Sequence, residues 1–312
     1  MRRTMSLLLL AAGLAFPATA HAWNKSGHML TGALAYYQLR QSDPAAIPRI
    51  IEVLQQHRAW SQWMDALERD ATAGPQDRDL FVFMYAARYP DDFKSEAGYN
   101  EDVFSPQHYV DFPFKPAGQP ASVHTQPPEA INLLQAYPAY VGALASADSS
   151  PAAKALALSF LFHLTGDVHQ PLHAAQLFTT RYPNGDQGGN LFYIRLPDGS
   201  RPKLHSYWDG IVIRSDRFAD VRAAALALLA DPALARETYA ELSDGSVQHW
   251  AQNESFPAAV QTAYRNGTLR ASTTEANARL VPDGYVVDAT RTAQRRITLA
   301  GYRLGDFLGT TF

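Results

Sequence analysis

Apolar side chains recur at helical spacing along most of the chain. Positions three and four residues apart share one face of a helix, so this spacing marks a buried stripe. The pattern predicts helices over residues 27–39, 45–56, 79–87, 129–145, 151–169, 216–229, 233–242 and 288–308. The last carries Ile297, Ala300, Leu304 and Phe307 at helical spacing, and we interpret this stripe as core packing.

One segment, residues 191–196, has the composition of a strand. The turn signal Pro197-Asp198-Gly199 follows it, so we expect a small β-hairpin that returns through Lys203 and Leu204. The chain shows no internal repeat, charge block or low-complexity linker. The sequence therefore predicts a single all-α domain of many helices with one small β-hairpin.

Residues 1–22 have the three parts of a secretory signal peptide. Arg2 and Arg3 give a positive start, residues 7–16 are apolar, and Ala20-His21-Ala22 fits a cleavage site. Cleavage after Ala22 would leave Trp23 at the start of a secreted or periplasmic domain over residues 23–312. No apolar run of about 18 or more residues follows Trp23, so we expect no membrane span.

The composition restricts how the domain is held together and how it attracts a ligand. About 290 residues remain after cleavage, enough for one large core, and cysteine is absent, so disulfides cannot stabilise it. The chain has 27 Lys and Arg against 30 Asp and Glu, a net charge of −3. Loss of Arg2 and Arg3 makes this about −5, which argues against a broadly basic nucleic-acid-binding protein.

The segment from His163 to His173 carries the densest candidate chemistry. His163 and Asp167 are four residues apart and share one helix face. A proline then ends the helix, so that His173 can turn toward a second metal. His205 and Asp209 repeat the same spacing. Imidazole and carboxylate donors without thiolates suit catalytic zinc. The alternative is a helix with ordinary buried histidines, but the repeated pair favours a metal site.

A third candidate group lies at the expected new N-terminus. The free α-amine of Trp23 and its own carbonyl oxygen can chelate a metal as a five-membered ring, and His28 follows closely in the sequence. The alternative is that Trp23 is a hydrophobic residue at a frayed end. The two other His and Asp groups favour the chelate.

These groups belong to an ordered series of motifs that extends along nearly the whole chain after residue 22. The series consists of Trp23 with His28, Tyr89-Pro90-Asp91-Asp92, His108-Tyr109-Val110-Asp111, residues 163–173, Gly188-Gly189-Asn190, residues 204–209 and residues 250–255. It resembles the S1/P1-type nucleases, which are secreted zinc-dependent single-strand nucleases and 3′-nucleotidases. Fungal and plant relatives typically carry disulfides, whereas this chain, like bacterial-type members, has no cysteine.

The resemblance implies three zinc ions. The first would be held by Asp91, His108, His163 and Asp167. The second would be held by His173, His205 and Asp209. The third would be held by the amine and carbonyl of Trp23 and by His28, with Asp167 bridging it to the first zinc.

The remaining histidines are expected outside the ligand set. His169 would support the ligands through hydrogen bonds that fix their tautomers. We expect His57, His124 and His249 at the surface because their sequence surroundings are polar.

The resemblance also implies the reaction. Two zinc ions bridged by Asp167 would activate a shared water for attack on phosphorus, and the remaining zinc would stabilise the leaving 3′-oxygen. Asp91, Asp167 and Lys94 would be the catalytic residues. Lys94 stands where the family usually has an arginine, and it supplies charge without a bidentate fork. The products would be 5′-phosphomononucleotides from single-stranded RNA or DNA, and nucleosides from 3′-mononucleotides.

Substrate binding is expected around an unpaired base. Tyr109 would stack on the base, with core packing as its alternative. Asp111 would accept a hydrogen bond from the base edge, and Asn190 would contact the base or phosphate. The Pro- and Gly-rich residues 113–128 are predicted to form a surface loop beside this pocket. Lys115 in that loop would steer phosphate, unless it is only a solvated surface lysine.

Two other functions remain open at this point. A zinc-dependent phospholipase C resembles this family in fold and ligands, and a non-catalytic periplasmic zinc-binding protein would need the same donors. The Thr165–His173 stretch and the Gly-Gly-Asn segment favour the nuclease, and we expect it to be a monomer. The preference between RNA and DNA, the preferred base and the pH optimum do not follow from the sequence.

Overall fold

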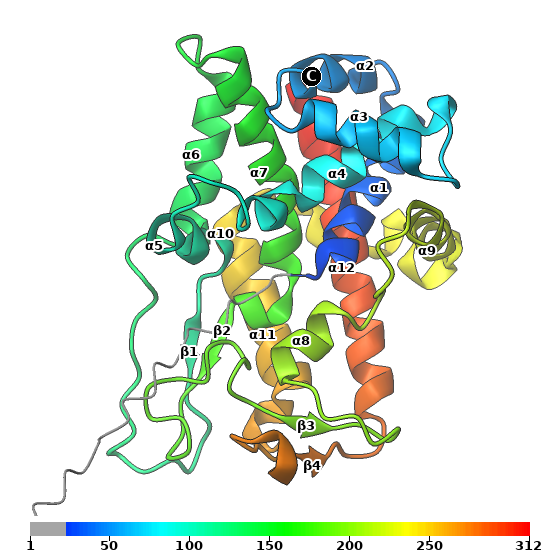
Figure 1. The fold of residues 1–312 in the computed structure, drawn as a ribbon. Coiled ribbons are helices and arrows are strands. Elements are labelled where there is room, and N and C mark those ends of the chain that lie inside the picture. The colour runs from blue at the N-terminus through cyan, green and yellow to red at the C-terminus, as the bar shows by residue number, and fades with distance from the viewer. Residues whose placement is uncertain (1–22) are drawn as a thin grey trace, which may run out of the picture.

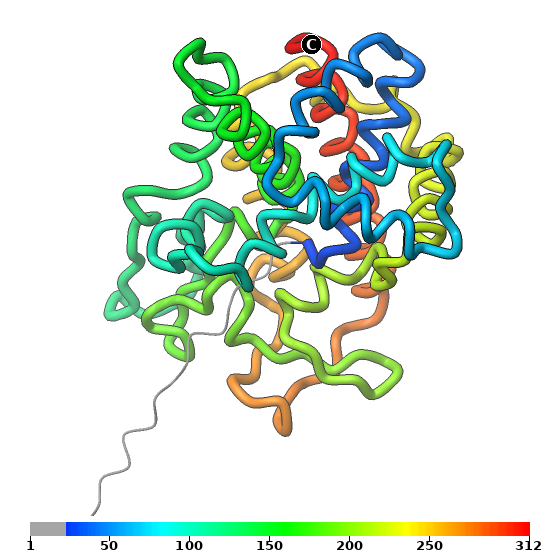
Figure 2. The backbone as a smooth tube through the Cα atoms, turned by 45° about the horizontal axis from the view of Figure 1, so that its top comes forward, coloured from blue at the N-terminus to red at the C-terminus, as the bar shows by residue number. Residues whose placement is uncertain are grey.

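The computed structural model describes residues 23–312, and the expected signal peptide of residues 1–22 lies outside the described residues. Four helices form the centre: α1 (Lys25–Ser42), α4 (Arg78–Phe93), α7 (Pro151–His169) and α12 (Tyr285–Thr311). α1 packs against the other three, and α7 also contacts α4 and α12 (Figure 1). Figure 2 shows α1 in blue beside α12 in red, although they lie at opposite ends of the sequence.

Two glycines allow these helices to approach closely. A methyl group at Gly32 would overlap the backbone carbonyl of Phe83 in α4, and one at Gly301 would overlap the side chain of Leu34. Glycine is favoured where two backbones must come this close. The contacts bring the N-terminal turn of α1 against the C-terminal halves of α4 and α7, where four of the nine candidate ligands lie.

Other helices and turns surround this centre. The outer α-helices are α2 (Ala46–Leu54), α3 (Trp60–Arg69), α5 (Glu101–Phe104), α6 (Leu133–Ala145), α8 (Leu204–Asp209) and α9 (Phe218–Ala230). α10 (Val247–His249) and α11 (Phe256–Ala258) alternate with π-helical turns at Trp250–Ser255 and Ala259–Ala263. Short 3-10 turns cover Pro75–Asp77, Ser105–His108, Pro171–His173, Pro232–Leu234, Arg236–Thr238, Ala240–Ser243, Arg265–Gly267 and Glu275–Asn277.

The strands are short and pair in parallel. β1 (Phe112–Phe114) pairs with β2 (Ala175–Leu177), and β3 (Ile194–Arg195) pairs with β4 (Arg279–Leu280). β1 begins four residues after His108, and β2 begins two residues after His173. The first pair therefore joins two segments that carry candidate ligands.

The predicted all-α class is confirmed, with shifts at several helix ends. The range 151–169 coincides with α7, whereas α4 runs six residues beyond the predicted end at residue 87. The helix predicted at 233–242 is wrong, because this stretch forms three separate 3-10 turns. Asp231 caps the first turn by accepting from Ala233 N. The buried residues Leu234 and Tyr239 lie five apart, which does not fit one helix face.

The hairpin prediction is confirmed in its hydrogen bonds but not in its length. Ile194 N donates to Pro202 O at 3.1 Å and Leu196 N to Ser200 O at 2.9 Å, so the chain folds back as expected. Regular strand covers only Ile194–Arg195 of the predicted 191–196, and its strand partner is β4 rather than the returning arm. Among residues 23–312, no helix has both the length and the apolar character of a membrane span.

His57 is a correction to the expected surface histidines. Its ring is buried, stacked on Trp63 at 4.6 Å between centroids and edge-on to Tyr89. Ala59 N donates to its Nδ1 at 3.1 Å. Burial, with Arg58 nearby, lowers the pKa of His57 to about 3, so it packs as a neutral aromatic ring.

Candidate metal centre

The candidate ligands converge from separate parts of the fold. His28 lies in the first turn of α1, Asp91 in the last turn of α4, and His163 and Asp167 on one face of α7. The others come from the two 3-10 turns at Ser105–His108 and Pro171–His173 and from α8. All are buried. They form three groups whose ligand atoms lie within 4.8 Å of one another: His28, Asp91 and His163; His108, His163 and Asp167; and His173, His205 and Asp209.

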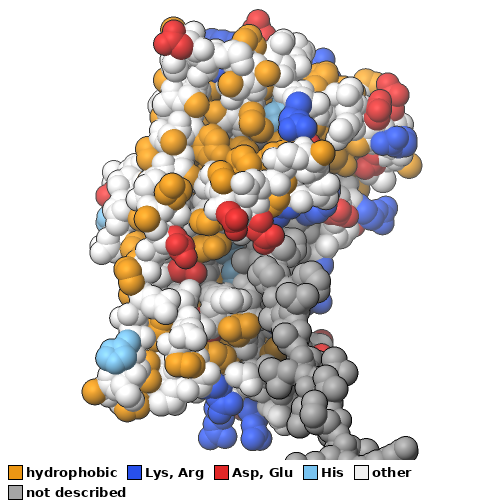
Figure 3. All heavy atoms as spheres, turned by 60° about the vertical axis from the view of Figure 1, so that its left-hand side comes forward, with side chains coloured by type: hydrophobic (Ala, Val, Ile, Leu, Met, Phe, Trp, Pro, Cys, Tyr) orange, Lys and Arg blue, Asp and Glu red, His pale blue; other side chains and the backbone are white. Residues whose placement is uncertain are grey.

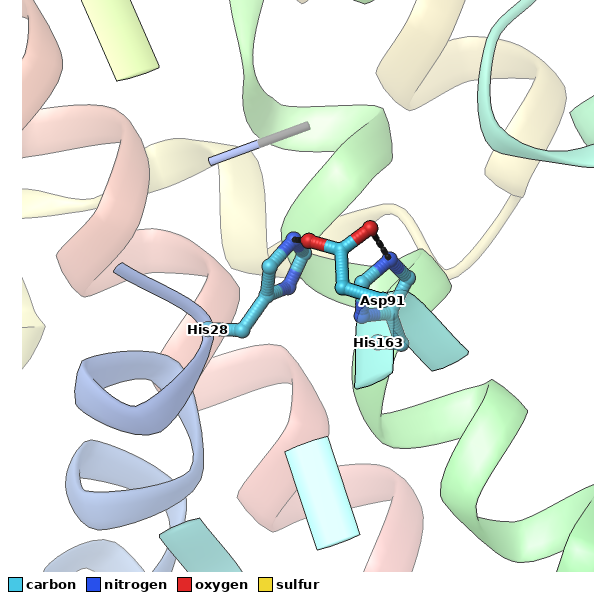
Figure 4. Close-up of side chains that lie close together, drawn as sticks. All are labelled: His28, Asp91 and His163. Atoms are coloured by element: carbon cyan, nitrogen blue, oxygen red, sulfur yellow. Dashed lines mark ion pairs between the residues drawn. The ribbon is translucent and has the colours of Figure 1, made fainter. Parts of the chain in front are cut away.

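The first group is arranged around a carboxylate. Asp91 points its two oxygens at different rings, with Oδ2 3.9 Å from His28 Nε2 and Oδ1 3.9 Å from His163 Nε2 (Figure 4). The two rings stack with centroids 3.6 Å apart. Three donor atoms from α1, α4 and α7 therefore face a common point.

Asp167 lies at the middle of the whole centre. Its Oδ1 is 3.3 Å from His28 Nε2, while its Oδ2 is 3.2 Å from His163 Nε2 and 3.0 Å from His108 Nδ1. Its Oδ1 also lies 3.9 Å from His173 Nδ1. The two oxygens face different imidazoles, which is an arrangement that suits a carboxylate shared by two cations.

Backbone carbonyls fix the orientation of three rings. His163 Nδ1 lies 2.8 Å from Ala87 O, His173 Nδ1 2.6 Å from His108 O, and His205 Nδ1 2.6 Å from Gly188 O. A carbonyl can only accept, so each Nδ1 carries the hydrogen and each Nε2 keeps a lone pair. This is how histidine ligands are usually held.

Several buried polar atoms at this centre test whether a cation fits. Among the described residues, His28 Nε2, His108 Nε2, His173 Nε2 and Asp167 Oδ1 have no hydrogen-bond partner. Leaving a buried polar atom unsatisfied costs about 1–3 kcal/mol. Because imidazole and carboxylate donors are those that zinc binds at catalytic sites, a divalent cation fits these residues.

The electrostatics keep two carboxylates charged. Burial alone would raise the pKa of Asp91, but the Lys94 ammonium, with Nζ 2.6 Å from Asp91 Oδ1, and the nearby imidazoles hold it well below its usual range. Burial likewise opposes ionisation of Asp167, and His163 and His28 outweigh it, so its pKa is also lowered. Both groups therefore offer anionic oxygens at neutral pH.

Asp209 differs from the other two carboxyl groups. Burial raises its pKa well above the usual value, the charges of Asp91 and Asp167 add to this, and the hydrogen bond from Gln170 Nε2 at 2.7 Å opposes it. A cation bound beside His205 would favour the ionised form of Asp209.

Burial, with Lys94 adding, lowers the pKa of His108 to about 4, so its ring is neutral at pH 7 and able to bind a cation.

Trp23 is fixed between the ligand elements. Its indole is fully buried, and its Nε1 donates to Gly166 O at 2.9 Å, next to Asp167 in the chain. Asn24 N donates to Asp209 O at 3.3 Å, and Asn24 caps α1 by accepting from Gly27 N at 2.9 Å. The start of the described chain is thus close to α7 and α8, and chelation by the Trp23 amine and carbonyl stays a prediction.

Several supporting residues were missed by the sequence analysis although they lie within its motifs. Gln170 accepts from Leu172 N at 2.6 Å while donating to Asp209, so it fixes the turn that carries His173. Gly166 leaves room for the His28 ring, because a Cβ there would lie 3.0 Å from His28 Nδ1. Their position beside predicted ligands was the only signal available in the sequence.

The loop that holds His205 depends on two further residues. Gly188 has a φ of +58°, and a Cβ there would lie 2.6 Å from Leu172 O, so only glycine places its carbonyl against His205 without strain. Asp186 is buried and accepts from Leu177 N at 2.9 Å and from the Tyr264 hydroxyl at 2.9 Å. These bonds anchor the loop to β2 and to the C-terminal half.

A pocket of about 630 Å³ opens beside this centre. Tyr109, Asp111 and Asn190 line it together with His205, so these three expected substrate-binding residues lie beside a candidate ligand. Burial, with Asp111 adding, raises the pKa of Tyr109 to about 12, so its ring is a neutral surface. Asp111 has a φ of +52°, a strained value for a residue with a side chain, which suggests a functional reason for its position. Residues 126–128 of the predicted loop also line the pocket.

Two expected residues lie elsewhere. Lys115 does not line the pocket, and its Nζ donates to Pro120 O at 3.0 Å and Val123 O at 2.8 Å within its own loop. His169 is bonded at both nitrogens, with Nδ1 2.7 Å from Thr165 O and Nε2 2.8 Å from Arg303 Nη1. The ring of His169 therefore does not reach the side chain of a candidate ligand, contrary to our expectation.

Comparisons of the sequence with known proteins found one family model and several relatives. The family model of the S1/P1 nucleases matches residues 23–312. Endonuclease 3 of Arabidopsis thaliana is 29% identical over 172 residues, which are 50% of this chain and 51% of that protein. Endonuclease 4 of the same plant is 29% identical over 167 residues, 50% of each chain. This chain thus spans about half the length of the curated relatives that it matches.

Proposed function

The chain belongs to the S1/P1 nuclease family, and from that premise we propose that it is a zinc-dependent endonuclease. It hydrolyses phosphodiester bonds of single-stranded RNA and DNA to 5′-phosphomononucleotides, and it releases nucleosides from 3′-mononucleotides. The observation that carries this proposal is the set of three buried His and Asp groups that meet around Asp167, beside an open pocket.

We assign three zinc ions to these residues. One is held by Asp91, His108, His163 and Asp167. A second is held by His173, His205 and Asp209. A third would be held by the amine and carbonyl of Trp23 and by His28, with Asp167 as a ligand common to this site and the first. The unsatisfied nitrogens of His28, His108 and His173 and the free Asp167 Oδ1 support the assignment.

The chemistry is divided between the cofactor and the side chains. Zinc supplies Lewis-acid charge at the reacting phosphodiester and makes water a better nucleophile at neutral pH. Nearby positive groups lower the pKa values of Asp91 and Asp167. Both carboxylates therefore remain anionic and can bind the cations. Lys94 holds Asp91 in place through an ion pair and adds positive charge beside the candidate ligands.

The pocket beside His205 selects an unpaired base. Tyr109 stacks on it, a contact worth about 1–3 kcal/mol for any base. Asp111 accepts a hydrogen bond from the base edge, and Asn190 contacts the base or the phosphate. A base in a duplex is stacked and paired, so it cannot enter the pocket without being extruded.

Processing at the N-terminus is part of the proposal. Cleavage after Ala22 exports the protein to the periplasm or the medium and frees the Trp23 amine. Support comes from the signal-like composition of residues 1–22 and from the burial of Trp23 against Gly166. Mass spectrometry of the protein from its native host checks this step, because any other first residue would contradict it.

A zinc-dependent phospholipase C is the second candidate. One observation favours it: carboxylate side chains line the pocket whereas, among its described lining residues, Lys and Arg are absent. Such a lining would suit a cationic lipid head group. Parallel assays on single-stranded DNA and phosphatidylcholine separate the two functions, and turnover of lipid alone would refute the nuclease.

The central experiment removes ligands one at a time. His163→Ala and Asp167→Ala should each lower the zinc content, measured by mass spectrometry of the metal, and should abolish hydrolysis of single-stranded DNA. His124→Ala is the matched control, because this histidine is exposed in the loop before α6 and should change neither quantity. Full activity in both ligand variants would contradict the proposed centre.

A further inference from the structure

Three carboxylates lie at the mouth of the pocket, by which we mean the exposed part of its lining. Glu101 and Asp102 begin α5, and Glu129 lies four residues before the start of α6. All three are exposed, whereas Asn190 and His205 deeper in the pocket are buried. The charged side chains in the exposed part of the pocket lining are therefore all carboxylates.

No ion pair between described residues neutralises the carboxylates of this mouth. Among the described residues, none of those that line the pocket is Lys or Arg, and none of the three carboxylates takes part in a salt bridge. The ammonium of Lys115 is bonded to the carbonyls of Pro120 and Val123 in its own loop. Figure 3 looks onto the face with α5 and α6 and shows several acidic side chains near its middle, with Lys and Arg atoms beside them and toward the edges.

A single-stranded nucleic acid carries one negative charge at every linkage. The scissile phosphate lies at the buried centre, where Lys94 and bound cations would attract it. With the base in the pocket, as proposed above, we expect the next phosphate along the strand to lie nearer the mouth, where it would meet negative charge. At low salt, each carboxylate about 10 Å from this second phosphate would weaken binding of the strand roughly twofold in a water-like dielectric.

We infer that Glu101, Asp102 and Glu129 select substrates by charge, disfavouring any substrate with a second phosphate beside the scissile one. This inference rests on the proposed nuclease function and narrows its substrate class. Dinucleotides, 3′-mononucleotides and strand ends are preferred over interior linkages of a long strand. Salt should therefore speed the reaction on polyanionic strands, which is opposite to the usual loss of nucleic-acid affinity with salt.

The test compares two trinucleotides that differ in one charge. In the first, both linkages are phosphates, and in the second, the flanking linkage is a neutral methylphosphonate. At an ionic strength of about 10 mM, the zinc-loaded wild type should favour the neutral substrate roughly five- to tenfold in kcat/KM, and the preference should fade at about 0.5 M salt. Anisotropy measurements with non-hydrolysable phosphorothioate analogues should show the same ratio in binding.

Two triple variants carry the same change in net charge. Glu101→Gln/Asp102→Asn/Glu129→Gln should bring the ratio close to one. Glu52→Gln/Asp148→Asn/Glu275→Gln alters three exposed acids outside the pocket lining and should keep the wild-type ratio. If the pocket variant does not fold, Glu129→Gln alone should reduce the ratio by about twofold.

The outcomes separate the two claims. Turnover of both trinucleotides with equal ratios in wild type and pocket variant would overturn the selection by charge and leave the nuclease intact. No turnover of either trinucleotide, with hydrolysis of a phosphocholine ester instead, would overturn the nuclease and this inference with it.

Discussion

Replacing Asp186 by asparagine should remove a loss of stability that the protein suffers as the pH rises. Asp186 is fully buried, and burial raises its pKa from the ordinary 3.8 to about 7 although Leu177 N and Tyr264 donate to it. The folded protein therefore keeps a proton that the unfolded chain releases. Asparagine has the same shape and no charge, and the Tyr264 hydroxyl can rotate to accept from its amide.

The sign and size of the effect follow from proton linkage. Between pH 3.8 and 7 the folded state binds more protons than the unfolded state, so the free energy of unfolding falls as the pH rises. The stabilising contribution is complete below pH 3.8 and is lost as the pH passes through about 7. At about 1.36 kcal/mol for each pH unit, the total is about 4 kcal/mol, an upper value for a group that stays fully buried.

The assay is urea unfolding followed by tryptophan fluorescence from pH 4 to 7.5. The difference in unfolding free energy between Asp186→Asn and wild type should grow in favour of the variant by up to about 4 kcal/mol across this range. Protonation of the metal ligands affects both proteins and cancels in the difference. Asp148→Asn, at an exposed position, should show no such trend. A difference that is constant with pH would refute the reasoning.

Three further predictions concern the metal centre and the pocket. A protein with one extra residue before Trp23 should bind two zinc ions rather than three and lose most activity, and three bound zinc ions would contradict the terminal chelate. Tyr109→Ala should weaken binding of a short oligonucleotide by about 1–3 kcal/mol while sparing a small activated phosphodiester; an equal loss on both would argue against stacking. Gln170→Leu removes the hydrogen bond to Asp209 and should weaken one zinc site by about 10- to 100-fold in chelator competition, whereas unchanged affinity would show that this bond does not matter.

The sequence predicted the ligand helix well because its signals are strong and local. Ser150 caps α7 by accepting from Ala153 N, Pro151 occupies the first position, and Pro171 follows the end of the helix. The predicted end of α4 was less successful. Pro90 suggests a break, yet it lies inside the last turns of α4, so that Asp91 is presented from a helix.

Other elements were missed for reasons of periodicity. The π-helical turns Trp250–Ser255 and Ala259–Ala263 do not follow the spacing of an α-helix, so a search at that spacing passes over them. In α3, Trp63 is the single buried residue, which leaves no stripe to detect. His57 is polar by type but lies between two aromatic rings contributed by other elements.

The candidate site was predictable in its residue types but not in its supports. His163, His173 and His205 are oriented by backbone carbonyls, and any residue can supply a carbonyl. Likewise, the sequence does not show that the Lys115 side chain closes its own loop, since the carbonyls it binds lie five and eight residues away. Such contacts become visible only after the chain is folded.

The convergence of ligands from α1, α4, α7 and α8 governs how fast the centre can exchange its metal. Each candidate ligand is buried, and Gly32 and Gly301 keep the central helices in tight contact. An ion held between α1, α4 and α7 lies away from the pocket lining, so it can leave only through a local opening of these helices. The rate at which a chelator removes these ions should therefore be set by the rate of that opening, whatever the affinity of the chelator for the metal.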